Sequence, residues 1–176
     1  MPHWEVGKIG GGGSTQVLLI EDDTGFARMV QKMITEIEGE PFNFERVENL
    51  EKGINRLKGG GIDVVLLDLL LPDSEGIFTF IKLREAARDV PVVVMSALED
   101  DETAILAVRE GAQDYLFKGI VNPAVLIRSI RHSIERKRNR DELRQTREDL
   151  EVLLEKKDAE IADLKKRLDA ALKNKK

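Results

Sequence analysis

The sequence predicts an α/β protein in which a doubly wound, five-stranded parallel sheet is followed by one long C-terminal helix. Between residues 16 and 135, five short apolar runs alternate with segments of helical spacing. Three of these runs are continuous rather than alternating, as expected for strands that are buried on both faces. After Pro123 the chain contains neither glycine nor proline, which favours a single extended helix. Because crossovers between parallel strands are right-handed, a doubly wound sheet is the economical topology.

The expected elements follow one another in regular order. The five strands are expected at residues 17–20, 42–47, 64–67, 92–95 and 115–117. The helices are expected at residues 25–38, 49–58, 75–87, 101–110 and from 122 onward. Glycines mark the expected helix ends, at Gly39, Gly59 to Gly61 and Gly111. Prolines mark strand ends or helix starts, at Pro72, Pro91 and Pro123.

Composition divides the chain into three expected segments. Residues 1–15 are expected to be a flexible leader, because they include Gly10 to Gly13 and Ser14. Residues 16–135 form the globular domain, and residues 136–176 continue its last helix. The last segment carries 14 basic and 10 acidic side chains, whereas residues 1–135 carry 14 and 23. A domain this acidic is a poor candidate for contacting phosphates, so nucleic acid is not an expected partner.

The location follows from what the sequence lacks. The chain contains no cysteine, which excludes disulfides and thiolate metal sites and is compatible with a reducing compartment. Residues 1–14 have no apolar core of a secretion signal, and no stretch reaches about 18 apolar residues. We therefore expect a cytoplasmic protein without a membrane partner.

The C-terminal helix has the spacing of a coiled coil. Apolar residues fall at heptad positions d (Leu143, Leu150, Leu164, Ala171) and a (Leu154, Ile161, Leu168). Arg147 at position a and Lys157 at position d interrupt this seam. Because a lone helix of this kind frays in water, we expect a parallel homodimer; the alternative is a surface helix of an absent domain. Nearer the domain, an apolar face is expected to pack on the sheet through Ile127, Ile130 and Ile134.

Polar side chains follow four of the five expected strands. The first strand is followed by Glu21 and Asp22, the third by Asp68, the fourth by Ser96 and the fifth by Lys118. The carboxyl ends of parallel strands meet at one edge, where ligands bind. Crowded carboxylates repel each other, so either a cation lies there or their pKa values rise. Oxygen ligands on short loops suit Mg²⁺, and a lysine beside them can contact a phosphoryl oxygen.

Four motifs in this order resemble the receiver domains of response regulators, the phosphorylated partners of two-component signalling. They are Leu18 to Asp23, Asp68 to Asp73 with Gly76, Met95 to Ala97, and Gly111–Ala112 with Tyr115 to Lys118. The resemblance covers residues 16–135. It implies a flavodoxin-like sheet of strand order 2-1-3-4-5. It also implies that Asp68 accepts a phosphoryl group from a partner histidine kinase or phosphotransfer protein.

The resemblance assigns the remaining roles around the phosphoacceptor. It implies that Asp22, Asp68 and the backbone carbonyl of Leu70 hold Mg²⁺ directly, while Glu21 acts through a water. Mg²⁺, Lys118 and the Ser96 hydroxyl would then surround the phosphoryl oxygens.

The same resemblance implies a switch. Phosphorylation would draw Ser96 inward and let Tyr115 rotate, changing the face made by the fourth helix, the fifth strand and the fifth helix. The dimeric coiled coil would pass this change to a downstream protein that the sequence does not name. The chain would catalyse only its own phosphoryl transfer and slow dephosphorylation, so we do not expect a separate enzyme.

Four further positions near the site carry expectations. Asp23 is expected to cap the helix that begins near Thr24 rather than to bind metal. Leu70 and Leu98 are apolar where the family places residues that flank the attacking water, so we expect slow hydrolysis of the aspartyl phosphate. Gly119 departs from the family pattern, which usually has proline after the lysine.

Two other functions remain open at this level. The chain could be a receiver module cut from a longer signalling enzyme, such as a kinase, sensor or cyclase. It could also be a receiver-like scaffold that takes no phosphate and serves only for oligomerisation. The intact set of Asp22, Asp68, Ser96 and Lys118 argues against the scaffold.

Overall fold

The computed structural model describes residues 14–35, 41–97 and 101–173, without the side chains of residues 168, 169 and 171–173 near the C-terminal end. Five parallel strands form one sheet in the order β2-β1-β3-β6-β7. These strands are β1 (Thr15–Ile20), β2 (Phe42–Val47), β3 (Val64–Asp68), β6 (Val92–Ser96) and β7 (Asp114–Phe117). This layout is the predicted order 2-1-3-4-5, because the short strands β4 (Leu70–Leu71) and β5 (Ser74–Glu75) take two numbers in between. The predicted fold class is confirmed.

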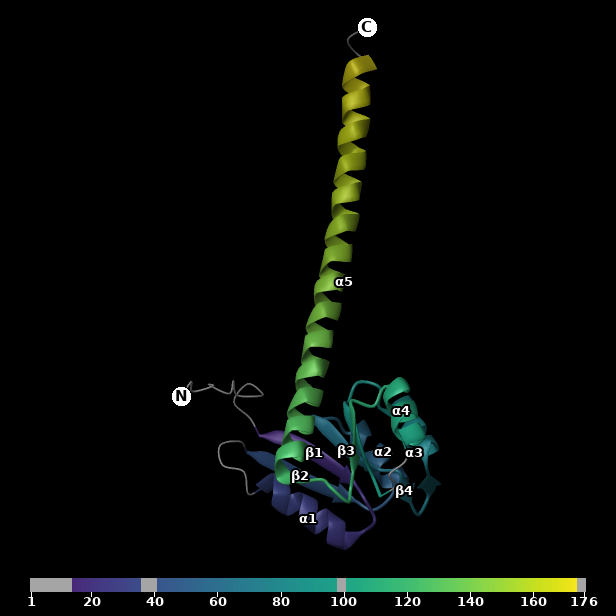
Figure 1. Ribbon diagram of the computed structural model, residues 1–176. Helices are drawn as coiled ribbons and strands as arrows, with labels where there is room; N and C mark the ends of the chain where they lie inside the picture. The colour runs from purple at the N-terminus through teal and green to yellow at the C-terminus, as the bar shows by residue number, and fades with distance from the viewer. Residues whose placement is uncertain (1–13, 36–40, 98–100, 174–176) are drawn as a thin grey trace. The chain divides into compact units, whose positions relative to one another are not determined.

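Helices cover both faces of this sheet (Figure 1). They are α1 (Thr24–Thr35), α2 (Leu50–Lys58), α3 (Ile77–Ala86), α4 (Asp101–Arg109) and α5 (Pro123–Lys173). Alternate residues of each strand point to opposite faces, so β1 contributes Leu18 and Ile20 to the core under α2, α3 and α4. On the opposite face, Val17 and Leu19 of β1 pack with α1 and the beginning of α5. All residues of β3 and β6 are buried, which explains their continuous apolar runs.

The segment between β3 and α3 differs from expectation. Here β4 and β5 pair as a short antiparallel hairpin that the sequence analysis did not predict. The expected helix at 75–87 begins at Ile77, because Gly76 has a φ of 65° and donates its N–H to the carbonyl of Leu69 at 2.8 Å. The expected helix at 25–38 is described as far as Thr35. Residues 36–38, Gly39 and Leu98 lie outside the described residues.

The last helix takes part in two separate units of the chain, residues 1–137 and 138–176. In the first unit Ile127 and Ile130 are buried and Ile134 is half-buried against the sheet, as predicted. In the second unit the apolar seam residues are between 47% and 72% exposed, at Leu143, Leu150, Leu154, Ile161 and Leu164. None of the helices in the described ranges combines the length and apolar character needed to cross a membrane.

Candidate functional site

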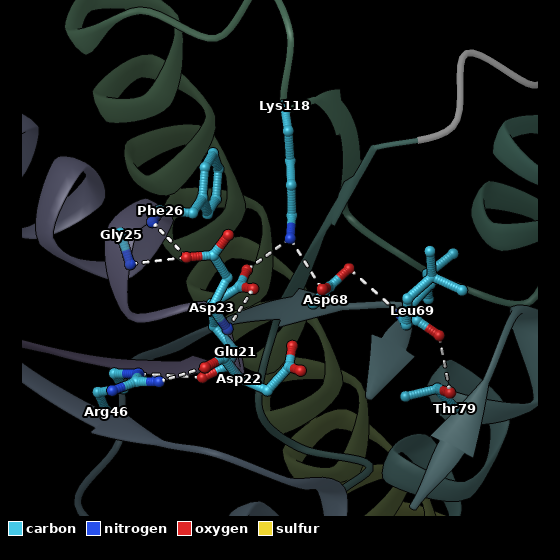
Figure 2. Close-up of polar contacts among 11 residues, drawn as sticks. Glu21, Asp22, Asp23, Gly25, Phe26, Arg46, Asp68, Leu69, Thr79 and Lys118 are labelled. Atoms are coloured by element: carbon cyan, nitrogen blue, oxygen red, sulfur yellow. Dashed lines mark hydrogen bonds and ion pairs between the residues drawn. The ribbon is translucent and has the colours of Figure 1, made fainter. Parts of the chain in front are cut away.

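The loop after β1 brings three acidic residues to the carboxyl edge of the sheet. Glu21 is completely buried, whereas Asp22 and Asp23 are exposed. The Asp23 Oδ1 atom accepts hydrogen bonds from the N–H of Gly25 at 2.6 Å and of Phe26 at 3.1 Å (Figure 2). These hydrogen bonds, that of Phe26 first, lower the pKa of Asp23. Asp23 therefore caps α1, as the sequence predicted.

One ammonium group joins the two buried carboxylates (Figure 2). Lys118, which follows β7, donates from Nζ to Glu21 Oε2 at 2.6 Å and to Asp68 Oδ2 at 2.8 Å. Asp68 ends β3 and is only 3% exposed. The other oxygens also have donors: Glu21 Oε1 accepts from the N–H of Asp23 at 3.2 Å, and Asp68 Oδ1 from that of Leu70 at 3.2 Å. Every oxygen of the two buried carboxylates is thus hydrogen-bonded.

A single lysine does not fully compensate two buried carboxylates. Burial raises the pKa of Glu21; the hydrogen bond from Lys118 opposes this rise, and the nearby charge of Asp68 adds to it. The net result is a pKa above the ordinary value. A site in which a carboxylate resists ionisation in this way favours a second cation.

The acidic residues provide a suitable set of ligands for such a cation. Carboxylate oxygens of Glu21, Asp22 and Asp68 all lie within 4.8 Å of one another. Mg²⁺ prefers hard oxygen ligands at about 2.0–2.1 Å and keeps several waters, which an open site allows. Asp22 is exposed, so this cluster opens to solvent. These residues fit the Mg²⁺ that the sequence analysis predicted.

Ser96 reaches the site through strand register. It is the last residue of β6 and is completely buried, and its backbone carbonyl accepts a hydrogen bond from the backbone N–H of Lys118 at 2.8 Å. Asp68 pairs with Met95 in the β3–β6 ladder, so Ser96 lies one residue beyond the pairing partner of Asp68. This backbone arrangement places the serine between the strands that carry Asp68 and Lys118.

Tyr115 lies farther from this edge than the other predicted residues. It pairs with Val94 in the middle of β6, two residues before Ser96. Its side chain is half-buried and packs against the core on the side of α2, α3 and α4. The structure therefore places Tyr115 beside the core under α4, and not among the carboxylates.

Arg46 is a site residue that the sequence analysis missed. From the end of β2 its guanidinium donates to the carbonyl of Glu21 at 3.0 Å and to that of Asp22 at 2.7 Å (Figure 2). These two bonds fix the backbone of the loop that carries both acids. No side-chain pattern could have revealed them, since their acceptors are backbone carbonyls.

The loop after Asp68 is held by two further bonds that were not predicted. The buried hydroxyl of Thr79 donates to the carbonyl of Leu69 at 3.2 Å. The carboxylate of Asp73 accepts the N–H groups of Leu50 and Glu51, each at 2.9 Å, and so caps α2 from another segment. The backbone beside Asp68 is thereby tied to α2 and α3.

A doubly wound sheet with a lysine-bridged acidic cluster at its carboxyl edge is the arrangement expected of the receiver-domain class. Consistent with this class, the family model of the response regulator receiver domain matches residues 17–131. The chain belongs to this family.

Named relatives support the assignment. The chain is 32% identical over 112 residues to the swarming motility regulation protein RssB of Serratia marcescens, covering 64% of this chain and 50% of that protein. It is 36% identical over 104 residues to the KDP operon transcriptional regulatory protein KdpE of Escherichia coli, covering 59% and 44%. The chain therefore spans about half the length of the curated relatives it matches.

Solved structures agree with the fold. A response regulator receiver domain protein of Clostridium thermocellum matches with a TM-score of 0.61 and 25% identity, covering 70% of this chain and 97% of that chain. A CheY-like receiver domain protein of Methanospirillum hungatei matches with a TM-score of 0.63 and 21% identity, covering 73% and 99%. The second likeness shows the fold alone.

Proposed function

We propose that the chain is a phosphorylation-dependent signalling switch in which Asp68 accepts a phosphoryl group from a partner histidine kinase or phosphotransfer protein. The observation that carries this proposal is the environment of Asp68. Its buried carboxylate lies 2.8 Å from the Lys118 ammonium and within reach of two further carboxylates. This arrangement suits a group that must become a mixed anhydride surrounded by positive charge.

The proposed phosphoryl transfer is an in-line displacement at phosphorus. An oxygen of Asp68 forms a bond to phosphorus while the bond from phosphorus to the donor histidine nitrogen breaks, and that nitrogen keeps the electron pair. Such transfers depend on positioning and charge neutralisation more than on covalent chemistry by the protein. Lys118 and the Ser96 hydroxyl contact the phosphoryl oxygens in this proposal. It is supported by the bond from Lys118 to Asp68 and by the position of Ser96 directly after Met95, the ladder partner of Asp68.

The proposed Mg²⁺ ligands are the carboxylates of Asp22 and Asp68 and the carbonyl of Leu70. Glu21 is assigned a role through a water, which its burial and its hydrogen bond to Lys118 support. When bound, Mg²⁺ supplies neutralisation of the phosphoryl charge.

The proposed output runs through α4, β7 and α5. Ser96 moves toward the phosphoryl group, and Tyr115, which packs under α4, rotates into the released space. On α4 the side chains of Ile105 and Val108 are 55% and 54% exposed, so this face offers apolar surface to a downstream protein.

A parallel homodimer through residues 136–176 completes the proposed switch. Pairing would cover the exposed leucines and isoleucine of the seam at about 25 cal/mol per Å² of apolar surface. The two charges that interrupt the seam each have an acid on their own helix: Arg147 with Glu151 at 3.2 Å, and Lys157 with Glu160 at 2.6 Å. These ion pairs reduce the cost of placing two positive charges at a dimer interface.

A second candidate function is favoured by one observation, the half-length match to the curated relatives. Under it, the chain is the receiver module of a longer signalling protein whose output lies in another domain. The length of the native gene separates this candidate from output through the helix itself. In both cases we propose that the protein acts in the cytoplasm.

The phosphoryl-transfer proposal is tested with phosphoramidate, a small donor that has the same phosphorus–nitrogen bond as phosphohistidine. With Mg²⁺, wild-type protein is expected to gain one phosphoryl group by intact mass, and Asp68→Asn none. If Asp68→Asn gains the group as readily as wild type, the assignment of the phosphoacceptor is wrong.

A further inference from the structure

The Lys118 ammonium has a third neighbour besides the two carboxylates. The ring of Phe26, in the first turn of α1, lies with its centroid 4.5 Å from Lys118 Nζ (Figure 2). This distance is well inside the range of about 6 Å at which an aromatic face attracts a cation. Lys118 is therefore held on three sides, by Glu21, Asp68 and Phe26.

The surroundings strengthen this cation–π contact. The Lys118 side chain is only 13% exposed, and the attraction between a cation and a ring grows as water is removed. A lysine has a flexible four-carbon stem, so two hydrogen bonds at its tip leave the ammonium able to pivot. A ring face against the same ammonium restricts that motion without taking any of its N–H donors away from oxygen.

The position of Phe26 is itself fixed by the acidic loop. Its backbone N–H donates to Asp23 Oδ1 at 3.1 Å, and the next residue, Ala27, donates to the Asp23 carbonyl at 3.0 Å. The ring is half-buried and packs against the core beside α1. The turn that presents Glu21 and Asp22 therefore also places the ring.

We propose that Phe26 is a positioning residue for phosphoryl transfer: the negative face of its ring holds the Lys118 ammonium where it meets the phosphoryl oxygen on Asp68. This inference rests on the proposed function. As Asp68 becomes a phosphoryl carrier, its contact with Lys118 must change, whereas the contact with Phe26 can persist. The electrostatics of the ring, and not its volume, set the effect.

The test varies the ring electrostatics at nearly constant shape. Phe26 is replaced in full-length protein by phenylalanines with one, two and three ring fluorines, which progressively weaken the negative face. The rate of labelling by acetyl phosphate with Mg²⁺ is then followed by intact mass; Asp68 bonds to phosphorus and acetate leaves. We expect the logarithm of the rate to fall steadily with fluorination, by about three- to tenfold in total. The same series at Phe42, at the opposite end of β2 from Arg46, is the matched control and should leave the rate unchanged.

A second readout, by NMR, needs neither metal nor donor. Ring currents of Phe26 should shift the NMR signals of the Lys118 side chain upfield in wild type. Phe26→Leu should abolish this shift and Phe26→Tyr should retain it. In the labelling experiment, Phe26→Leu should be as slow as the most fluorinated variant, and Phe26→Tyr should label at the wild-type rate.

The outcomes separate this inference from the proposed function. Wild-type protein that labels normally, with a flat fluorination series or with Phe26→Leu as fast as wild type, overturns the role of Phe26 alone. Wild-type protein that takes no phosphoryl group overturns the proposed function and this role with it. A graded loss at Phe26 with none at Phe42 supports the inference.

Discussion

Lys118→Met should destabilise the protein, and Mg²⁺ should largely reverse the loss. The substitution removes the hydrogen bonds of 2.6 and 2.8 Å to Glu21 and Asp68 and leaves both carboxylates buried. Because Lys118 retains some contact with water, we expect a loss of about 2–4 kcal/mol in the free energy of unfolding at neutral pH. Methionine keeps much of the apolar stem, so packing changes little.

The loss should depend on pH in a defined direction. The pKa of Glu21 in the folded protein is already raised, by burial first and by Asp68 in addition. The unfolded chain therefore loses this proton first, and the free energy of unfolding falls as the pH rises above the ordinary pKa of a glutamate. Without Lys118, which lowers that pKa, the cost at neutral pH grows. It should diminish as pH falls toward the ordinary value of Glu21, where the carboxyl is protonated.

Urea unfolding of wild type, Lys118→Met and the control Lys82→Met, each with EDTA or with Mg²⁺, measures these effects. Lys82 is an exposed lysine on α3 and should give wild-type stability. A ligand at a hundredfold excess over its Kd adds about 2.7 kcal/mol, and Mg²⁺ should stabilise Lys118→Met more than wild type because the ammonium no longer competes for the carboxylates. Equal stabilisation of both proteins, or a loss below about 1 kcal/mol in EDTA, would refute the reasoning.

Three further predictions concern the supports of the site and the helix. Arg46→Leu should weaken Mg²⁺ binding by about tenfold at most, because it removes the hydrogen bonds to the carbonyls of the β1–α1 loop but keeps the metal ligands. Isothermal titration calorimetry measures the affinity for Mg²⁺, and an unchanged affinity would contradict this prediction. Asp73→Ala should cost about 1 kcal/mol in urea unfolding at neutral pH by removing its cap on the N–H groups of Leu50 and Glu51, while Asn49 still caps that of Lys52. Burial pushes the pKa of Asp73 up, but the two N–H donors lower it overall, so its contribution is present above the ordinary pKa and lost as pH falls through the folded value; a cost that persists in acid would argue against the cap. Truncation after Arg138 should convert the proposed dimer to a monomer in sedimentation experiments, and an equally stable dimer would assign dimerisation to the receiver.

The core of the fold was predictable because its patterns are local. Runs such as Val64 to Leu67 are buried on both faces and so are apolar at every position. The acidic cluster at the carboxyl edge of the sheet was predictable because parallel strands bring their carboxyl ends together, independently of the loop conformations. The β4–β5 hairpin was missed because two residues per strand are too few to show periodicity.

Other features lie beyond what sequence patterns encode. The bonds of Arg46 end on backbone carbonyls, which leave no trace in residue type. The contact between Phe26 and Lys118 joins the first helix to the residue after the last strand and depends on the direction of two side chains. In the sequence, Phe26 is indistinguishable from any apolar residue of α1.

The most direct test of the central claim is chemical trapping of the phosphorylated residue. After incubation with acetyl phosphate and Mg²⁺, borohydride reduces an acyl phosphate to an alcohol, so a phosphorylated aspartate becomes homoserine. Peptide mass spectrometry then locates the change. We predict homoserine at position 68 in wild type, and none there when Mg²⁺ is withheld. Homoserine at Asp22, Asp73 or another aspartate, with position 68 unchanged, would contradict the account.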